Sequence, residues 1–174
     1  MALLQILTEP NRTLREKSSI VEKVDSGIQK FMDDMLETMY AAPGIGLAAI
    51  QVGIPKRIIV MDIARKDEPK NPMCFVNPEI IVTSKNNSVY EEGCLSVPGQ
   101  FAEIERPESC HIKYLDYYGQ KKEVKAKGML ATCIQHEMDH LEGILFIDYL
   151  SKLKKTMIIK KLTKQKKAIE RIVV

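Results

Sequence analysis

The segment 135–140, Gln-His-Glu-Met-Asp-His, constrains this chain more than any other. Apolar residues recur around it at spacings of three and four across 128–143, where a glycine stands at each end, and this pattern predicts an α-helix. Residues four apart share a helix face, so His136 and His140 can direct ring nitrogens at one metal ion. Glu137 is turned about 100° around the axis and can reach a water on that ion. The H-E-x-x-H pattern therefore predicts a metal site with its own general base.

The same pattern also fits a surface helix on which Glu137, Asp139 and His140 simply face water. The chain has three histidines, however, and two of them stand here. This economy favours a metal site.

A catalytic four-coordinate site needs a third protein ligand and an open position. Phe146 stands where a metzincin has its third histidine, and Lys160 and Lys161 stand where a thermolysin-like site has a glutamate. The third ligand must then come from upstream, where the candidates are Cys74, Cys94, Cys110, His111 and Cys133. We favour Cys94, because glycine before it and Ser-Val-Pro-Gly after it predict a constrained, irregular loop. The other cysteines fall in apolar patterns typical of buried residues, and His111 falls in a predicted strand.

Composition indicates an ordinary globular protein, with 174 residues of which 45% are hydrophobic and 28% charged. No apolar run approaches the length of a membrane span, and residues 1–7 lack the features of a secretory signal. Four cysteines without a paired framework indicate reduced thiols. We therefore expect one domain, 1–174, in the cytoplasm, without membrane contact and monomeric by default.

The remaining pattern predicts an α+β fold. Asp25 and Ser26 offer an N-cap for an amphipathic helix that ends at Ala42-Pro43-Gly44. Strands are predicted over these ranges: 57–63, 75–82, 110–118 and 122–126. Short strands with polar turns between them predict antiparallel β-sheets, here packed around the central H-E-x-x-H helix. The stretch 8–24 is predicted to be a loop.

A basic helix is predicted from about residue 151. From Lys152 onward the chain has nine basic residues and one acid, so this segment carries +8 and the remainder −5 of a total of +3. We favour a solvated helix face, and the alternative is docking onto a polyanion such as RNA.

Small residues are concentrated in 44–53, where Gln51 is the only side-chain amide. They leave the backbone open to close approach by another chain or a ligand. Taken alone, the segment indicates a tight packing junction, since it lacks the third glycine of a nucleotide-binding motif.

Three motifs now stand in order: Gly-Ile-Gly-Leu-Ala-Ala-Ile-Gln at 44–51, Glu-Gly-Cys-Leu-Ser at 92–96, and the helix motif at 135–140. Together they resemble the signature motifs of the peptide deformylases. The resemblance extends from the amino terminus to about Ser151, and the basic end resembles the bacterial type with a helical C-terminus. Phe101 and Glu103 are less typical of the family.

The resemblance implies that Cys94, His136 and His140 hold one divalent metal ion. Fe²⁺ is the ion expected in this family, and Zn, Ni or Co can replace it. Ligand softness and geometry alone would have favoured zinc. A thiolate beside Fe²⁺ is vulnerable to oxygen, so activity that decays in air would fit iron.

The resemblance also implies the reaction, which removes the formyl group from N-formyl-methionyl nascent peptides and releases formate. In it Glu137 is the general base, and the Gln51 amide and the Leu95 backbone N–H stabilise the developing oxyanion. The backbone of Gly44, Ile45, Gly46 and Leu47 would align the peptide in strand fashion.

Two further expectations concern the surroundings of the metal. Met129, Thr132 and Cys133 lie one and two turns before His136, and with Ile45 they are the expected wall of an apolar methionine pocket. Glu92 is expected to support the metal ligands, with Arg106 as a partner.

Two other functions remain open from the sequence: a metallopeptidase that uses the same helix, and a non-catalytic domain with a closed structural metal that binds the ribosome through its basic end. A structural site has no use for a general base such as Glu137, which favours the enzyme.

Overall fold

The computed structural model describes residues 2–172. Over this range the chain forms three α-helices, three short 3-10 helices and seven strands. In order they are η1 (Arg12–Arg15), α1 (Ser26–Ala41), β1 (Gly46–Ala48), η2 (Ala49–Val52), β2 (Ile58–Met61), β3 (Met73–Thr83), β4 (Asn87–Cys94), β5 (Val97–Pro107), β6 (Ser109–Leu115), β7 (Lys121–Lys127), α2 (Gly128–Leu141), η3 (Phe146–Tyr149) and α3 (Lys152–Ile172).

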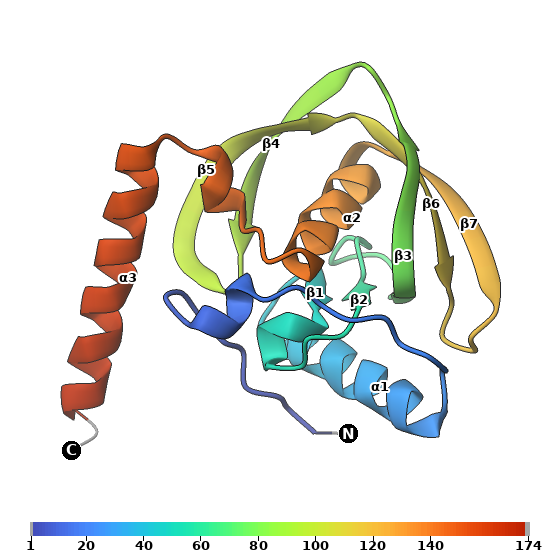
Figure 1. Cartoon of the computed structure of the whole chain (residues 1–174), viewed down its shortest axis with the longest axis horizontal. Coiled ribbons are helices and arrows are strands. Elements are labelled where there is room, and N and C mark those ends of the chain that lie inside the picture. The colour runs from blue at the N-terminus through green and yellow to red at the C-terminus, as the bar shows by residue number, and fades with distance from the viewer. Residues whose placement is uncertain (1, 173–174) are drawn as a thin grey trace.

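The strands form a five-stranded sheet in the order β1-β2-β3-β6-β7 and a separate two-stranded sheet, β4-β5. Every neighbouring pair of strands is antiparallel. Helix α2 contacts strands of the larger sheet and also β5 of the smaller one, and Figure 1 shows it enclosed between them. The α+β prediction, with antiparallel sheets around the H-E-x-x-H helix, is confirmed.

The helix boundaries follow from local chemistry. Asp25 caps α1 by accepting a hydrogen bond from the Ile28 N–H at 2.9 Å, and α1 ends just before Pro43. Gly128 is the first residue of α2 and Gly143 lies two residues beyond its end, with φ of +59° and +74°, backbone conformations that favour glycine. The predicted start of α1 and the predicted ends of both helices are confirmed.

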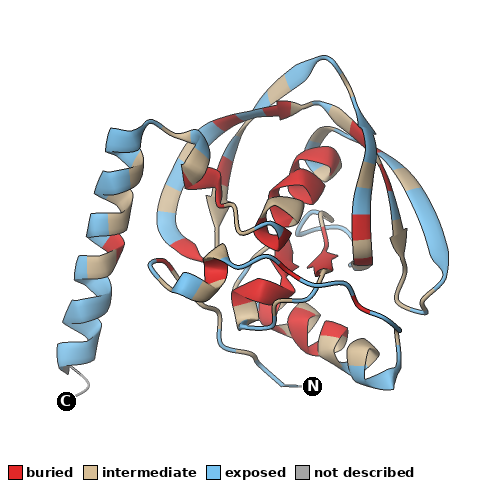
Figure 2. Cartoon of the chain, in the orientation of Figure 1, coloured by how far each residue is buried: buried red, intermediate tan, exposed pale blue. Residues whose placement is uncertain are grey.

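The core is densest around α1 and α2. Met32, Met35 and Met39 of α1 are fully buried beneath the larger sheet, which fits a role in core packing. Burying each such side chain stabilises the fold by roughly 1.5–3 kcal/mol. Figure 2 shows that α2 is mostly buried, whereas α3 is mostly exposed.

Helix α3 is anchored by its apolar stripe. Leu162 is buried in a cluster with residues of β5 and η3, and Ile158 and Ile159 pack beside it. The rest of the helix presents mainly lysines, as the predicted basic helix requires. Among the described residues, no helix combines the length and the apolar content needed to cross a bilayer.

The hairpin β4–β5 was not predicted, and Cys94 does not lie in an irregular loop. It is the last residue of β4 and faces Val97 of β5 across a tight turn. The hairpin is a sheet of its own with one exposed face, where Glu91, Glu103 and Glu105 alternate with other residues, so the sequence lacks the apolar runs used to predict the other strands. The predicted loop 8–24 contains the short helix η1.

Candidate functional site

Three side chains converge at the middle of the molecule. One ligand atom from each of Cys94, His136 and His140 lies within 4.8 Å of the other two, and this is the only such group found in residues 2–172. The Cys94 Sγ and the His140 Nε2 are 3.3 Å apart, and the two imidazole rings are 5.1 Å apart, edge to face. Both histidines are buried.

Two elements hold these side chains. One turn of α2 places His136 and His140 on the same face. The end of β4 brings Cys94 over that face, where the pairing of β4 with β5 shifts register between Gly93 and Cys94. The alternative of a water-facing helix is wrong, because Glu137 and His140 are buried as well.

The electrostatics of this group fit a divalent cation. Burial and the neighbouring His136 lower the pKa of His140 well below its usual value, which keeps that ring neutral as a ligand must be. Burial alone would lower the pKa of His136, but Cys94 and Glu92 raise it well above its usual value. A positive charge is thus favoured here, and a thiolate with two imidazoles is a ligand set that suits a first-row divalent metal.

The Glu92 side chain supports the His136 ring. The Nδ1 of His136 lies 2.8 Å from the Glu92 Oε2, and Arg106 donates to both carboxylate oxygens at 2.6 and 3.0 Å. Burial would raise the pKa of Glu92, but the hydrogen bonds from His136 and Arg106 outweigh it and lower the pKa. Because an ionised carboxylate only accepts, Nδ1 must donate, so Nε2 of His136 is the nitrogen that would bind a metal in place of a proton.

The Glu137 carboxylate lies beside the histidines but bonds to neither of them. It is 4% exposed, and its Oε2 has no hydrogen-bond partner among the described residues. Burial raises the pKa of Glu137 to about 7. A buried carboxyl group with a free oxygen next to a metal-ligand set is placed to exchange protons near neutral pH.

The side-chain amide of Gln51, which belongs to η2, approaches Cys94 from the side opposite to Glu137. Its Oε1 accepts from the Ala48 N–H at 2.8 Å, which fixes the amide orientation. Its Nε2 donates to the Ser96 hydroxyl at 3.0 Å and lies 3.5 Å from the Cys94 Sγ. Leu95 and Ser96 form the turn of the β4–β5 hairpin, directly after the cysteine.

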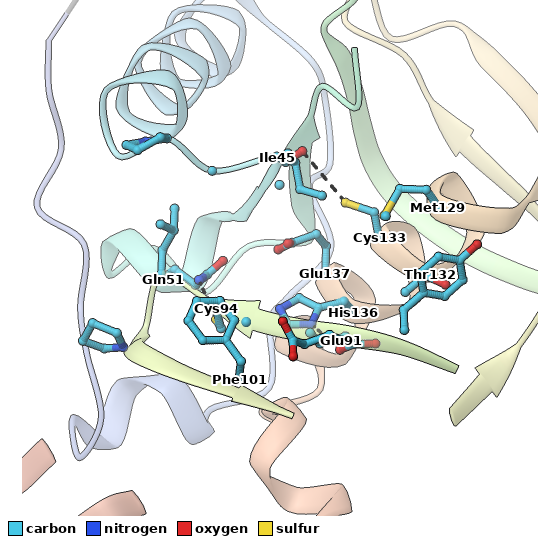
Figure 3. A pocket seen from close by; sticks show the side chains of 18 of the residues that line it. Ile45, Gln51, Glu91, Cys94, Phe101, Met129, Thr132, Cys133, His136 and Glu137 are labelled. Atoms are coloured by element: carbon cyan, nitrogen blue, oxygen red, sulfur yellow. Dashed lines mark hydrogen bonds and ion pairs between the residues drawn. The ribbon is translucent and has the colours of Figure 1, made fainter. Parts of the chain in front are cut away.

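A cavity of about 470 Å³ opens above these groups, between β1, the β4–β5 hairpin and α2. Figure 3 shows Cys94, His136 and Glu137 within it, with Ile45, Met129 and Cys133 around one end. The predicted residues that line it are Gly44, Ile45, Gly46, Gln51, Glu92, Cys94, Leu95, Met129, Thr132, Cys133, His136 and Glu137.

Two predicted site residues do not line this cavity. His140 lies below it and is 1% exposed. The Leu47 side chain is fully buried in the core against α1, because alternate residues of β1 point to opposite sides. A side-chain contact between Leu47 and a ligand in the cavity is therefore excluded.

Several wall residues were missed in the sequence, chiefly Phe101, which is 66% exposed at the rim. Phe101 pairs with Gly93 across the hairpin, and a Cβ on Gly93 would overlap its ring. The hairpin over 87–107 was not recognised in the sequence, and a regular two-residue turn would have paired Phe101 with Tyr90. The register shift between Gly93 and Cys94 is what brings Phe101 opposite Gly93. Ser96, the partner of Gln51, was missed because the hairpin was not recognised.

The chain is similar to proteins of one known family. Residues 3–156 match the family described as polypeptide deformylase. The peptide deformylase of Pelagibacter ubique is 67% identical over 95% of this chain and 96% of its own, and that of Phenylobacterium zucineum is 58% identical over 97% and 99%.

Solved structures agree with the sequence relatives. A peptide deformylase from Ehrlichia chaffeensis in complex with actinonin has a TM-score of 0.91 and 47% identity over 95% of this chain and 98% of that one. A peptide deformylase from Legionella pneumophila has a TM-score of 0.89 and 42% identity over 98% and 99%. The chain belongs to the polypeptide deformylase family.

Proposed function

We propose that this chain removes the formyl group from the N-terminal methionine of newly synthesised polypeptides and releases formate. Family membership supports the reaction. The observation that carries the proposal is the convergence of Cys94, His136 and His140 beside the buried carboxylate of Glu137 at the bottom of an open cavity.

Cys94, His136 and His140 are the proposed ligands of one divalent cation, which is Fe²⁺ in our proposal, with Zn, Ni or Co as substitutes. The donor set supports a soft or borderline ion, and zinc would satisfy it equally well. When bound, the cation supplies Lewis-acid activation of a water molecule and of the formyl oxygen. Three protein ligands leave a coordination position open for this purpose.

Glu137 is the proposed general base. It accepts a proton from the attacking water, whose oxygen forms a bond to the formyl carbon. It then delivers that proton to the departing amine as the carbon–nitrogen bond breaks, which yields formate and a free N-terminus. A positioned base of this kind contributes typically 10²–10⁴-fold in rate.

Gln51 and Leu95 are the proposed donors to the oxygen that becomes negatively charged. The fixed orientation of the Gln51 amide supports this role, because its Oε1 is held by the backbone and its Nε2 is directed toward Cys94. Donors already in place need no reorganisation when charge develops. The Leu95 N–H follows the metal-ligand cysteine directly in the chain.

The peptide is proposed to lie along β1, with its methionine side chain in the cavity. Strand β1 is the edge strand of the larger sheet, so its outer edge is available for strand-like pairing along Gly44–Leu47. Ile45, Met129 and Cys133 form an apolar end of the cavity, which suits an unbranched thioether side chain. Thr132 completes this wall.

The test is a coupled measurement on anaerobically purified protein. Metal content is determined per chain, and formate release is followed with a formyl-methionyl peptide and with the same peptide lacking the formyl group. We expect about one divalent ion per chain and formate release that stops on chelation. Cleavage of the unformylated peptide with comparable efficiency would favour a metallopeptidase instead. Four protein ligands and no catalysis would favour a structural metal.

We further propose that the protein acts in the cytoplasm as a single-domain monomer, with α3 docking on the ribosome. The charge of helix α3 supports the docking on the ribosome. One groove on its surface is lined by Lys160, Lys164, Lys167 and Arg171. A basic surface attracts the RNA phosphates. Newly made formylated chains would then reach the cavity as they emerge.

A further inference from the structure

A closed ring of hydrogen bonds joins α2 to the β4–β5 hairpin. It runs from His136 to Glu92 at 2.8 Å, from Glu92 to Arg106 at 2.6 and 3.0 Å, and from the Arg106 Nη1 to the Asp139 Oδ2 at 2.8 Å. His136 and Asp139 are three residues apart on α2, so the ring begins and ends on the same helix. The guanidinium of Arg106 is thereby held by two carboxylates at once.

The ring is buried except at Asp139. The side chains of Glu92 and Arg106 are each 5% exposed, whereas that of Asp139 is 20% exposed. Burial alone would lower the pKa of Arg106, but Glu92 and Asp139 outweigh this and raise it, so the guanidinium stays charged. A buried charge is costly unless its partners are fixed in good geometry, so the position of Asp139 matters to the whole ring.

Tyr149 of η3 lies outside this ring of hydrogen bonds and contacts two of its members. Its hydroxyl donates to the Asp139 Oδ2 at 2.8 Å, and its ring lies 5.0 Å from the Arg106 Cζ, within the range of a cation–π interaction. A small cavity of about 240 Å³ is lined by Asp139, Arg106 and Tyr149 on this side of α2. The substrate cavity lies on another face of the same helix.

We propose that Asp139 and Tyr149 are positioning residues of the metal centre. They hold the Arg106 guanidinium in one orientation, Arg106 holds Glu92, and Glu92 holds the His136 ring with its Nε2 directed at the metal position. The inference rests on the metal site proposed above. It adds two residues that touch neither the metal position nor the substrate cavity.

The two contacts of Tyr149 allow a graded set of variants. Tyr149→Phe removes only the hydrogen bond of the hydroxyl group, and Tyr149→Leu removes the aromatic ring as well. Asp139→Asn weakens the hydrogen-bond acceptor. Tyr117→Phe is a matched control, because the Tyr117 hydroxyl donates to Asp33 at 3.1 Å in another part of the molecule. All four changes are close to isosteric or are made at partly exposed side chains.

The experiment loads each full-length variant with Co²⁺ under anaerobic conditions, then measures the cobalt dissociation rate in excess chelator and the visible absorption spectrum. Loss of a group that bonds directly to a metal ligand typically costs 10–100-fold in metal affinity, so residues further out should act at the lower end of this range or below it. We expect cobalt dissociation to be about 10-fold faster in Asp139→Asn and Tyr149→Leu, and a few-fold faster in Tyr149→Phe. The ligand-field bands should shift in the same order, and Tyr117→Phe should match the wild type.

A purely structural role predicts a different result. If the variants lose thermal stability like Tyr117→Phe while their cobalt dissociation rate and spectrum stay at wild-type values, the inference is overturned. The proposed metal site would still stand in that case. If the wild type fails to retain cobalt, or Cys94→Ala retains it, the metal site itself fails and this inference falls with it. The two failures are therefore distinguishable.

Discussion

The carboxylate of Glu137 packs directly against the backbone of Gly46, at a point where an added Cβ would overlap its oxygen and Cδ atoms. Gly46 has no positive φ, so glycine is needed here for space and not for its backbone conformation. The edge strand proposed to bind the peptide thus also sets the position of the proposed general base.

Gly46→Ala should therefore displace Glu137 without removing it. We expect formate release to fall at least 10-fold, within the contribution of a positioned base, while metal content is unchanged. Gly27→Ala in α1 is the control, since a Cβ there meets only Asp25 at 3.3 Å. Equal kcat values for both variants would show that Gly46 does not position the base.

Glu137→Ala should separate chemistry from metal binding. It removes the proposed base but no ligand atom, so metal content should stay near that of the wild type while formate release falls by about 10²-fold or more. Cys94→Ala should lose both the metal and the activity. Metal analysis and a formate assay on the same preparations check this, and an active Glu137→Ala would contradict the proposed mechanism.

Gln51→Ala should lower kcat by about 10²–10³-fold with little change in KM, because an oxyanion donor acts mainly in the transition state. Ser96→Ala is the matched variant, since it removes the hydroxyl that accepts from the Gln51 amide but leaves the amide in place. Its loss should be much smaller. A similar kcat deficit in both would mean that the amide serves only to support the hairpin turn.

Asp148→Asn should destabilise the fold in a pH-dependent way. Burial would raise the pKa of Asp148, but Lys155, the Leu145 N–H and Arg15 outweigh it and lower the pKa. A carboxyl group whose pKa is lowered in the folded state stabilises the fold at pH values above its unfolded-state pKa. This contribution is lost as the pH falls through its folded-state pKa. The Asp148 side chain is 22% exposed, so solvent partly screens its ion pairs. We therefore expect Asp148→Asn to lower the unfolding free energy by about 1 kcal/mol at pH 7.

Urea unfolding of metal-free protein at several pH values measures this loss. The difference in unfolding free energy between the wild type and Asp148→Asn should shrink below about pH 4, near the usual pKa of an aspartate. A difference that stays constant down to pH 2.5 would assign the effect to packing instead of charge.

Replacing the basic groove of α3 should weaken ribosome binding. Truncation before Lys152 would expose the apolar cluster around Leu162, so we choose glutamine at Lys160, Lys164, Lys167 and Arg171. The affinity should fall, and the slope of log affinity against log salt should become shallower, because fewer counterions are released.

The matched control neutralises exposed lysines of β7 instead, at positions 121, 122, 125 and 127. This control has the same charge change on another surface, and it should bind like the wild type. Unchanged binding by the α3 variant would return this helix to the role of a solvated surface.

The sequence by itself determined the features that depend on near neighbours. One helical turn spaces His136 and His140 and turns Glu137 aside, and an N-cap with apolar periodicity predicts α1. These geometries follow from the backbone over a few residues. The family motifs were equally visible, because they are local strings of the chain.

Only the tertiary structure decided which distant side chains meet. Cys94 contacts His140, which is 46 residues away in the chain, and Gln51 contacts Cys94, which is 43 residues away. Both contacts depend on the β4–β5 hairpin, which was not predicted from the sequence. The burial of Leu47, the rim position of Phe101 and the contacts of Asp139 with Arg106 and Tyr149 arise in the same way. Each is set by strand register and helix packing, which are properties of the whole chain and not of any short segment.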